Sequence, residues 1–254
     1  MRSTSEIEGL YGIWLREFKV FQREKSRVIS AVAQPIIWLF LLGGGIGASI
    51  DPKSIGNVGY QRFLFPGIVA MSTMFGTVFY GLYIVWDRKI DVLKEILVAP
   101  ISRITVFFGK VLGGATDAMI TAFILLLLGV VLVGVAPLGL VGGLGIALLL
   151  AIGMVSIGLT LGAFFESMEG FQVIITFMIF PLFFLSAALY PVENLDPVMG
   201  AAVRANPVAY AVDALRWALI GKGSFDLWLD LAVLLLFDAA MVLLGTWAFR
   251  KMKL

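Results

Sequence analysis

Two acidic residues within predominantly apolar stretches, Asp117 and Asp238, are the side chains best placed to do chemistry. A carboxylate inside a membrane-crossing helix suggests a proton or ion path as its first interpretation. Asp117 follows Lys110 by only seven residues, less than two helical turns, which favours a structural position near the membrane surface. Asp238 lies near the middle of the last apolar stretch. It could hydrogen-bond a neighbouring helix or be protonated in place, and a part in a proton or ion path stays equally open.

Other kinds of chemistry are excluded by residues that the chain lacks. It has no Cys and no His, which excludes disulfides, Cys/His metal sites and a histidine general base. The phosphate-binding pattern G-x-x-x-x-G-K-[ST] is also absent, because Val111 and Gly223 follow the Gly-Lys pairs at 109–110 and 221–222. Any use of ATP would need a separate subunit, and we expect no enzyme activity, metal or cofactor in this chain.

The composition indicates a membrane protein. Hydrophobic residues make up 60% of the 254 residues and charged residues 14%, against about 45–50% and about 25% in an average soluble domain. A soluble fold of this size could not bury so much apolar surface, so lipid must cover part of it. The net charge of only +2 gives no sign of a nucleic-acid partner.

Charge-poor runs predict an all-α membrane protein with six transmembrane helices in one transmembrane domain over residues 1–254, since a helix needs about 20 mostly apolar residues to cross a bilayer. Of the 19 basic residues, 14 fall on the side that carries both termini and the other five on the opposite side. By the positive-inside rule both termini are cytoplasmic, and we expect the plasma (inner) membrane. The predicted spans are 28–50, 63–86, 104–133, 141–165, 170–190 and 227–249.

Residues 1–27 predict an amphipathic helix that lies in the membrane interface. Trp14 and Phe18 belong to an apolar stripe at helical spacing, whereas Arg16 and Lys19 belong to a mostly basic opposite face. Such a helix could be a surface anchor and nothing more, or it could also hold a partner.

The loop at 87–100 predicts a second amphipathic helix, on the cytoplasmic side. Asp87 is placed to cap its N-terminus and Pro100 to end it, which would make a rod roughly 20 Å long. A rigid amphipathic helix here suggests a docking surface for a cytoplasmic partner, or a helix that merely rests on the bilayer. The expected apolar stripe is Trp86, Ile90, Leu93 and Leu97, and the charged face is Arg88, Asp91, Lys94 and Glu95.

Residues 191–222, on the outer side, are too broken by prolines to cross the membrane and too apolar for a solvated loop. A re-entrant helical hairpin that dips into the outer leaflet fits this pattern. Arg216 lies in this segment. Because a charge near lipid must be satisfied, we expect Arg216 to pair with a carboxylate or to bind backbone carbonyl oxygens.

Three stretches form a recognisable combination of motifs. They are Phe65-Pro66-Gly67; the stretch from Asp87 to Lys110; and Phe184-Leu185-Ser186-Ala187-Ala188 with Tyr190-Pro191, then Asn206-Pro207-Val208-Ala209-Tyr210 and Arg216. Together they resemble the ABC-2 type transporter permeases, within them the branch that exports drugs, nodulation factors and polysaccharides, over nearly the whole chain. The sequence departs from that family at Asp91 and Ala187, where Gly is common, and at Asp196-Pro197, where the Pro usually comes one position earlier.

The resemblance implies the permease subunit of an exporter, without catalysis of its own. Two permease copies would pair, most simply as a homodimer, and each would bind one ATP-binding subunit that carries ATP and Mg²⁺. The cargo would be hydrophobic or amphipathic, such as a drug, a lipid or a lipid-linked glycan. The 87–100 segment would be the coupling helix seated in that subunit, and the N-terminal helix would brace it. The residues implied for coupling are Asp87, Arg88, Ile90, Leu93, Lys94, Glu95, Leu97 and Pro100.

In the same resemblance, residues 191–222 would close the outer end of the path. The outer residues that match the motifs are Tyr190, Pro191, Asn206, Pro207, Tyr210 and Arg216. The rival hypothesis, from another class, is an ion-coupled secondary transporter or channel that uses Asp117 and Asp238 and works without a second polypeptide.

Overall fold

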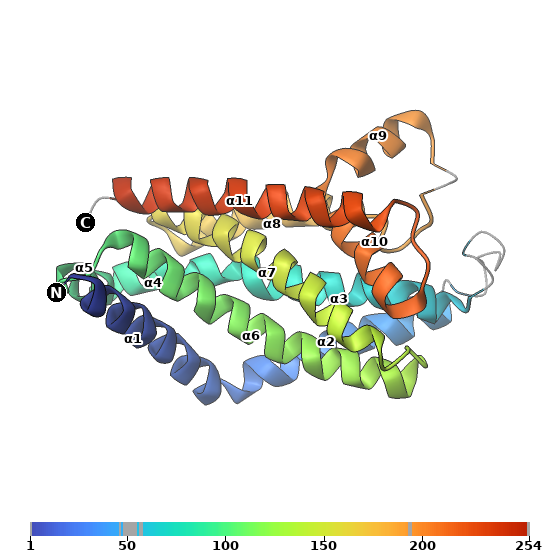
Figure 1. The fold of residues 1–254 in the computed structure, drawn as a ribbon, viewed down its shortest axis with the longest axis horizontal. Helices are drawn as coiled ribbons and strands as arrows, with labels where there is room; N and C mark the ends of the chain where they lie inside the picture. Colours follow the sequence, from blue (N-terminus) through green and yellow to red (C-terminus); the bar gives the residue numbers. More distant parts are fainter. Residues whose placement is uncertain (1, 46, 48–54, 56–57, 193–194, 253–254) are drawn as a thin grey trace.

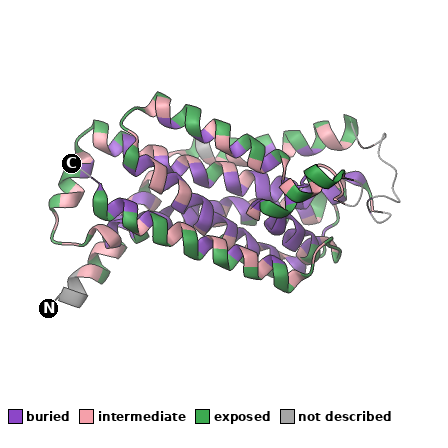
Figure 2. Ribbon diagram, turned by 90° about the horizontal axis from the view of Figure 1, so that it is seen from above, coloured by how far each residue is buried: buried purple, intermediate pink, exposed green. Residues whose placement is uncertain are grey.

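A computed structural model describes residues 2–45, 47, 55, 58–192 and 195–252, and within these ranges it contains helices and no strand. The long helices run roughly along the longest axis of the molecule (Figure 1). Buried residues lie between the helices and exposed residues around the outside (Figure 2). The expected all-helical class is confirmed.

Five helical stretches are long and apolar enough to cross a membrane. An additional helix, α8 (Met168–Phe184), is apolar but has 17 residues, the low end of what a bilayer requires. Each of these six stretches overlaps one predicted span, although α8 ends well before residue 190 and residues 46 and 48–50 of the first span lie outside the described residues. A multi-pass membrane protein is confirmed, and the count of six crossings stays a prediction. The five are α2 (Lys25–Gly45), α3 (Tyr60–Val78) continued by the 3-10 turn η3 (Phe79–Gly81) and α4 (Leu82–Lys89), α6 (Arg103–Leu132), α7 (Gly139–Phe164) and α11 (Leu227–Lys251).

Helix α7 occupies the centre of the bundle, where it packs against α3, α6, α10 and α11. Its closest approach is to η3. A Cβ on Gly81 would lie 1.9 Å from the carbonyl oxygen of Gly158, and one on Gly158 would lie 2.1 Å from that of Val78. The two backbones therefore touch, and only glycine on both sides permits this crossing.

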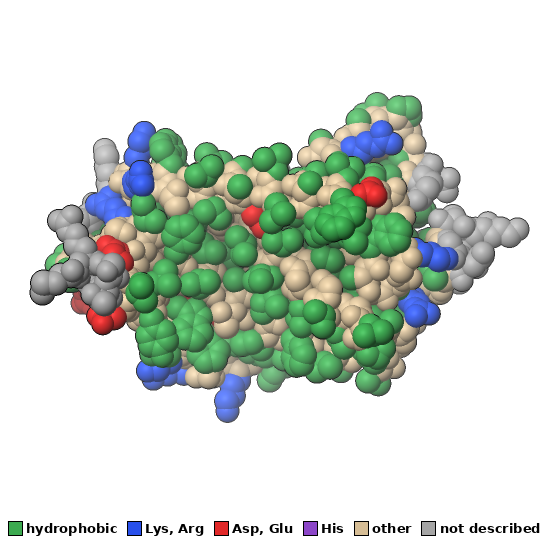
Figure 3. Space-filling view, in the orientation of Figure 1, with side chains coloured by type: hydrophobic (Ala, Val, Ile, Leu, Met, Phe, Trp, Pro, Cys, Tyr) green, Lys and Arg blue, Asp and Glu red, His purple; other side chains and the backbone are tan. Residues whose placement is uncertain are grey.

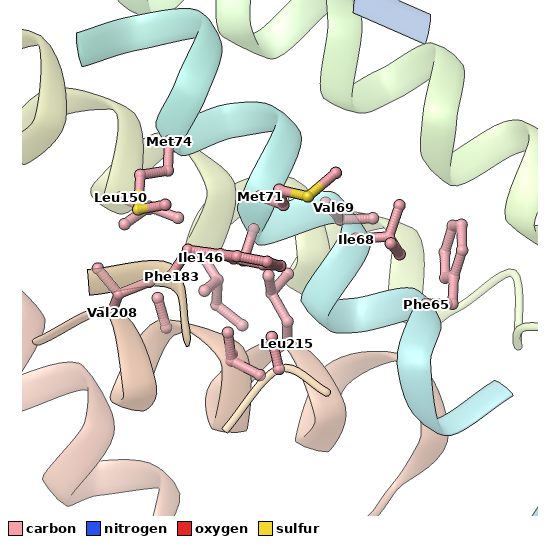
Figure 4. Close-up of a cluster of buried hydrophobic side chains, with 14 of the residues drawn as sticks. Phe65, Ile68, Val69, Met71, Met74, Ile146, Leu150, Phe183, Val208 and Leu215 are labelled. Atoms are coloured by element: carbon pink, nitrogen blue, oxygen red, sulfur yellow. The ribbon is translucent and has the colours of Figure 1, made fainter. Parts of the chain in front are cut away.

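The larger hydrophobic core lies between α3, α7, α8 and α10. Figure 4 shows Met71 and Met74 of α3 close to Ile146 and Leu150 of α7, with Phe183 at the end of α8. Because lipid is as apolar as these side chains, close packing rather than transfer out of water holds such helices together.

The outer surface of the bundle is apolar. Hydrophobic side chains cover the middle of the face seen in Figure 3, and Lys and Arg lie nearer its two ends. Val131 and Phe177, for example, are 81% and 78% exposed. A surface with this distribution is suited to lipid in the middle and to water or headgroups at the ends.

The 87–100 segment differs from its prediction. Helix α4 runs through Asp87 to Lys89, the chain then turns at Ile90 and Asp91, and a separate helix α5 (Val92–Val98) follows. Asp87 therefore lies inside a helix and is not an N-cap. Asp91 has φ 61°, a left-handed conformation that breaks the helix. The seven residues of α5 span roughly 10 Å, about half the predicted rod.

The outer segment folds into two short helices, α9 (Pro197–Ala205) and α10 (Pro207–Ile220), joined at Asn206. Each begins with a proline at its first position, which suits a helix start because that amide needs no partner there. Helix α10 packs against α3, α7 and α11. The placement of α9 and α10 within the outer leaflet stays a prediction.

The N-terminal and C-terminal segments lie at the same end of the bundle (Figure 1). The Ser102 amide donates to Glu6 near the N-terminus, and Arg103 donates to the Met252 carbonyl oxygen near the C-terminus. Both segments thus meet the start of α6. A shared side for the two ends is what an even number of crossings requires.

Because the chain has no Cys, single introduced cysteines can report which side of the membrane each loop faces. The exposed residues Glu8, Glu166 and Lys222 are suitable positions. An impermeant maleimide should label Glu8→Cys and Glu166→Cys only from the cytoplasmic side and Lys222→Cys only from outside. Labelling of Glu166→Cys and Lys222→Cys from one and the same side would mean that α8 does not cross, and six spans would be rejected.

Candidate functional site

Four charged side chains, Arg16, Glu17, Asp87 and Lys110, form what we call the ionic cluster, at the end of the bundle that carries the termini. The Lys110 ammonium is fully buried and donates to Glu17 at 2.9 Å and to Asp87 at 2.8 Å. Arg16 donates to the same two carboxylates, at 2.8 Å and 2.7 Å. The Tyr80 hydroxyl donates to the second Glu17 oxygen at 2.9 Å. Two cations thus face two carboxylates, and the cluster has no net charge.

The ionic cluster ties together three segments that are distant in the sequence: α1 (Arg2–Arg23), α4 and α6. Removing one partner from a buried ion pair costs about 3–5 kcal/mol, because the other charge is left without compensation. Burial lowers the pKa of the Arg16 guanidinium, but the hydrogen bonds and charges of Asp87 and Glu17 together outweigh it and raise that pKa overall. Arg16 therefore keeps its positive charge beside Asp87.

Helix α1 lies parallel to the first part of α6. Glu6 accepts a hydrogen bond from the Ser102 amide, 96 positions further along the chain. Ile13 lies against Gly109 and Glu17 against Gly113, and the members of each pair are also 96 positions apart. The Thr105 hydroxyl also donates to Glu6, and this bond, followed by the Ser102 amide, lowers the pKa of the Glu6 carboxyl. A carboxylate at the start of α6 also suits the positive end of that helix.

The residues predicted to characterise the N-terminal helix have different surroundings. Trp14 donates to the Thr116 hydroxyl at 3.0 Å and stacks on Phe18 with ring centroids 5.6 Å apart. Lys19 is exposed, whereas Arg16 turns inward to the ionic cluster. The buried Glu17 was missed by the sequence reasoning, although an acidic residue directly after Arg16 in a mostly basic stretch was a visible signal. A position in the membrane interface stays a prediction for this helix.

The corner between α4 and α5 is fixed to the rest of the bundle. Arg88 donates to the carbonyl oxygens of Phe165 at 2.6 Å and Ala163 at 2.9 Å, at the C-terminus of α7. Leu93 is only 2% exposed and packs into a core cluster of the same chain with residues of α1, α6 and α11. The expectation that Leu93 lies on an outward stripe needs correction, since its own bundle covers it.

The outward face of the α4–α5 corner is nonetheless apolar in part. Ile90 is 47% exposed and Val98 79% exposed. Lys94 and Glu95 are also exposed, and Lys94 pairs with Asp91 at 2.7 Å. We call Ile90, Asp91, Lys94, Glu95 and Val98 the α5 face. Leu97 is half-buried against the same core as Leu93, and Pro100 follows the helix end as expected.

Arg216, at the other end of the bundle, binds backbone carbonyl oxygens as expected. It is buried, and its guanidinium donates to Ala187 at 2.6 Å and to Ala188 at 3.4 Å. The guanidinium also stacks over the Phe63 ring, 4.0 Å from its centroid. The positive charge is thereby satisfied where lipid would otherwise surround it.

The other outer residues also hold backbone carbonyl groups. Asn206 caps α10 by accepting from the Val208 amide at 3.0 Å, and its own amide donates to Leu182 at 2.6 Å. The hydroxyl groups of Tyr190 and Tyr210 each donate to a carbonyl oxygen six residues earlier. The end of α8, α9 and α10 therefore form one connected unit. Within it Pro191 is partly buried and Pro207 begins α10.

Two non-glycine residues have positive φ within the described part of the chain, Asp91 at 61° and Ala187 at 55°. These are the two positions where the motif comparison expected glycine. A left-handed conformation costs an ordinary residue roughly 1–2 kcal/mol, and Asp tolerates it better than Ala. Each residue stands at a corner of the chain: Asp91 joins α4 to α5, and Ala187 presents its carbonyl to Arg216.

The two intramembrane acids lie on different helices, Asp117 on α6 and Asp238 on α11, and both are buried. Asp238 lies against Gly153 of α7, where a Cβ would be 2.5 Å from its carboxylate. Among the described residues no group of His, Cys, Asp and Glu could hold a metal ion.

Comparison with known proteins gives consistent matches over nearly the full length of the chain. The model of a family described as "ABC-2 type transporter" matches residues 8–220. Nodulation protein J of Rhizobium leguminosarum bv. trifolii is 25% identical over 94% of this chain and 92% of its own length. The putative transport permease ycf38 of Cyanophora paradoxa is 26% identical over 96% and 89%. The inner membrane transport permease YadH of Escherichia coli (strain K12) is 24% identical over 93% and 92%.

Replacing the buried cation of the ionic cluster should destabilise the chain strongly. Lys110→Met would leave Glu17 and Asp87 facing one partly exposed Arg16, at a cost of about 3–5 kcal/mol. Lys94→Met, the matched control, removes an exposed pair worth about 0.2–1 kcal/mol. Thermal unfolding of the purified chain in detergent measures both, and equal midpoints for the two variants would contradict a structural role for the cluster.

The left-handed residue at the outer corner should tolerate glycine. In Ala187→Gly, relief of roughly 1–2 kcal/mol of backbone strain offsets the roughly 0.4–1 kcal/mol of added unfolded-state entropy and about 0.8 kcal/mol for the lost buried methyl group. Ala188→Gly is the matched control, since Ala188 is equally buried but has no positive φ. Ala187→Gly should unfold close to the wild-type temperature and Ala188→Gly clearly below it. The reverse order would show that Ala187 is not strained.

Proposed function

The chain belongs to the ABC-2 type transporter family, and from this premise we propose that it is the membrane-spanning subunit of an ATP-driven exporter. As a multi-pass transporter permease, it has no phosphate-binding loop of its own. ABC-2 permeases generally pair with an ATP-binding subunit. ATP and Mg²⁺ would be bound there, and this chain would supply the path through the membrane.

The observation that carries this proposal is the construction of the α4–α5 corner. Its inward side is anchored by Leu93 in the core and by Arg88 on the end of α7. Its outward side, the α5 face, exposes Ile90 and Val98 beside charged residues. An exposed apolar patch with a charged rim, on a rigidly held short helix, is suited to a protein partner.

A force applied to the α5 face would reach most of the bundle through charged contacts. The neighbouring residue Asp87 connects α4 to Arg16 of α1 and to Lys110 of α6. Arg88 connects the same turn of α4 to α7, the central helix. Movement of the partner on ATP binding would thus displace α1, α4, α6 and α7 together, as rocking of a bundle requires.

The permease would work as a pair, most simply a homodimer, with one ATP-binding subunit on each copy. The apolar helix surfaces and the scarcity of charge favour a hydrophobic or amphipathic cargo, such as a drug, a lipid or a lipid-linked glycan, that leaves between the two copies. The unit made by the end of α8, α9 and α10 would close the outer end of that path. The location would be the plasma (inner) membrane, with both termini in the cytoplasm.

The rival hypothesis of an ion-coupled secondary transporter or channel rests on Asp117 and Asp238. Both are buried, but on separate helices. The two hypotheses differ in what the purified chain can do alone: an ion-coupled transporter moves its cargo in vesicles without a second polypeptide, whereas the exporter permease requires the ATP-binding subunit.

A charge placed on the α5 face should disrupt binding of the ATP-binding subunit. Val98→Glu removes about 1.5 kcal/mol or more of apolar burial and places a charge in the contact. At about 1.4 kcal/mol per tenfold, binding should weaken at least tenfold. Co-purification with the subunit and ATPase activity of the complex measure the effect.

Val198→Glu is the matched control, because Val198 is the same residue type with nearly the same exposure, 77% against 79%, on α9 at the opposite end. It should leave the binding unchanged. Wild-type co-purification and ATPase activity in Val98→Glu would remove the α5 face from the coupling contact. Equal losses in both variants would point to misfolding and would likewise count against a specific contact.

A further inference from the structure

Two acidic residues that neither the motifs nor the proposed function uses, Asp213 of α10 and Asp230 of α11, meet inside the outer end of the bundle. They are 1% and 0% exposed. The Asp213 carboxylate accepts from the Ser224 amide at 2.8 Å and 3.0 Å and from the Phe225 amide at 2.9 Å, in the turn that joins α10 to α11. Asp213 is therefore an acceptor, as an ionised carboxylate is.

Among the described residues, Asp230, unlike Asp213, lacks hydrogen-bond donors around its carboxyl group. Neither of its carboxyl oxygens receives a hydrogen bond from any donor in the described part of the chain. Its polar neighbour is Asp213, which lies within hydrogen-bonding reach. Two buried carboxylates in contact cannot both be ionised, whereas a carboxylic acid and a carboxylate form a strong hydrogen bond. A proton on Asp230 thus supplies the donor that its site lacks.

We infer that Asp213 and Asp230 form a proton-binding site, with the proton held by Asp230 and donated to Asp213. The proton acts as a structural ligand of the outer end. It joins α10 to α11, and the turn between them is wrapped around the same Asp213 carboxylate.

The charges nearby make this state electrically balanced. Arg216 lies one turn from Asp213, close enough for its charge to act on that carboxylate, and the exposed Asp226 caps α11 in front of Asp230. With one proton bound, Asp213 alone faces Arg216. Helix α7 packs on both helices without contributing any ionisable residue. The other ionisable side chains on the turn and on the packed helices are Lys222 on the turn, Tyr60 and Arg62 on α3, Arg103, Lys110 and Asp117 on α6, Arg204 on α9, Tyr210 on α10, and Asp238, Arg250 and Lys251 on α11.

Loss of the proton would bury a second negative charge beside Asp213, which a low-dielectric site resists. The repulsion would act on the helix that carries Arg216, and Arg216 holds the carbonyl groups of Ala187 and Ala188. The folded chain binds a proton that an unfolded chain releases above about pH 3.9. Stability at this end should therefore fall as the pH rises. This inference concerns the chain itself and does not depend on the exporter proposal.

Infrared spectroscopy of the purified chain tests the site directly. At about neutral pH the wild type should show a carboxylic-acid C=O band that is lost in Asp230→Asn. Asp226→Asn is the matched control: it removes an exposed carboxyl at the start of the same helix while keeping a side chain that can cap α11, and it should retain that band. Identical wild-type and Asp230→Asn spectra in this region would show that Asp230 is ionised and would overturn the inference.

Thermal unfolding provides a second readout. The amide of Asp230→Asn reproduces the donor of a protonated carboxyl group, so this variant should fold and should lose part of the wild-type decline in unfolding temperature between about pH 6 and about pH 8. Because the amide can make the hydrogen bond that the proton makes, failure of Asp230→Asn to fold would also contradict the inference. An unchanged pH dependence would show that the proton does not stabilise the outer end. A dependence on sodium concentration at fixed pH would assign the site to a metal cation instead and would also overturn it.

Discussion

A lysine ammonium group with no access to solvent requires anionic partners, and Lys110 finds both of its partners on other helices. Glu17 comes from a helix that precedes the first span, and Asp87 from the end of the second span that lies near the termini. Because the cost of a single missing partner is a large part of a domain's stability, this one cation determines where α1 and α4 end up relative to α6. The position of the α4–α5 corner, and therefore of the α5 face, follows from it.

Lys110 and Arg216 are buried cations at opposite ends of the bundle, and different groups stabilise their charges. At the end with the termini, the buried Lys110 is balanced by carboxylates from distant segments, although Arg88 at the same end binds carbonyl oxygens. At the other end, Arg216 is satisfied mostly by carbonyl dipoles and an aromatic ring. An ion pair fixes particular residues to one another. Carbonyl groups can instead be provided by any chain with the right backbone shape, here the left-handed turn at Ala187.

Much of the helical architecture could be predicted from the sequence, since lipid tolerates only apolar runs and the runs are long. That Arg216 would need a carboxylate or carbonyl partner was predictable because lipid cannot solvate its charge, but the choice of carbonyl groups required the fold. The 87–100 segment was mispredicted, because a charged residue after an apolar run looks like a cap, and only the fold shows that Asp87 meets Lys110. Leu93 and Glu17 show the same limit: amphipathic spacing identifies a face but not what covers it. Asp91 and Ala187 occupy positions where Gly is common in the family, and this difference indicated the left-handed conformation that both residues adopt.

The neutrality of the ionic cluster has an electrical consequence. A membrane voltage of 100 mV does about 2.3 kcal/mol of work on each elementary charge that crosses it. Arg16, Glu17, Asp87 and Lys110 add up to zero charge and are bonded to one another. If α1, α4 and α6 shift as one body, as the proposed export mechanism requires, this group contributes no gating charge, however far it moves through the field. The four residues of the ionic cluster would then take no energy from the membrane potential.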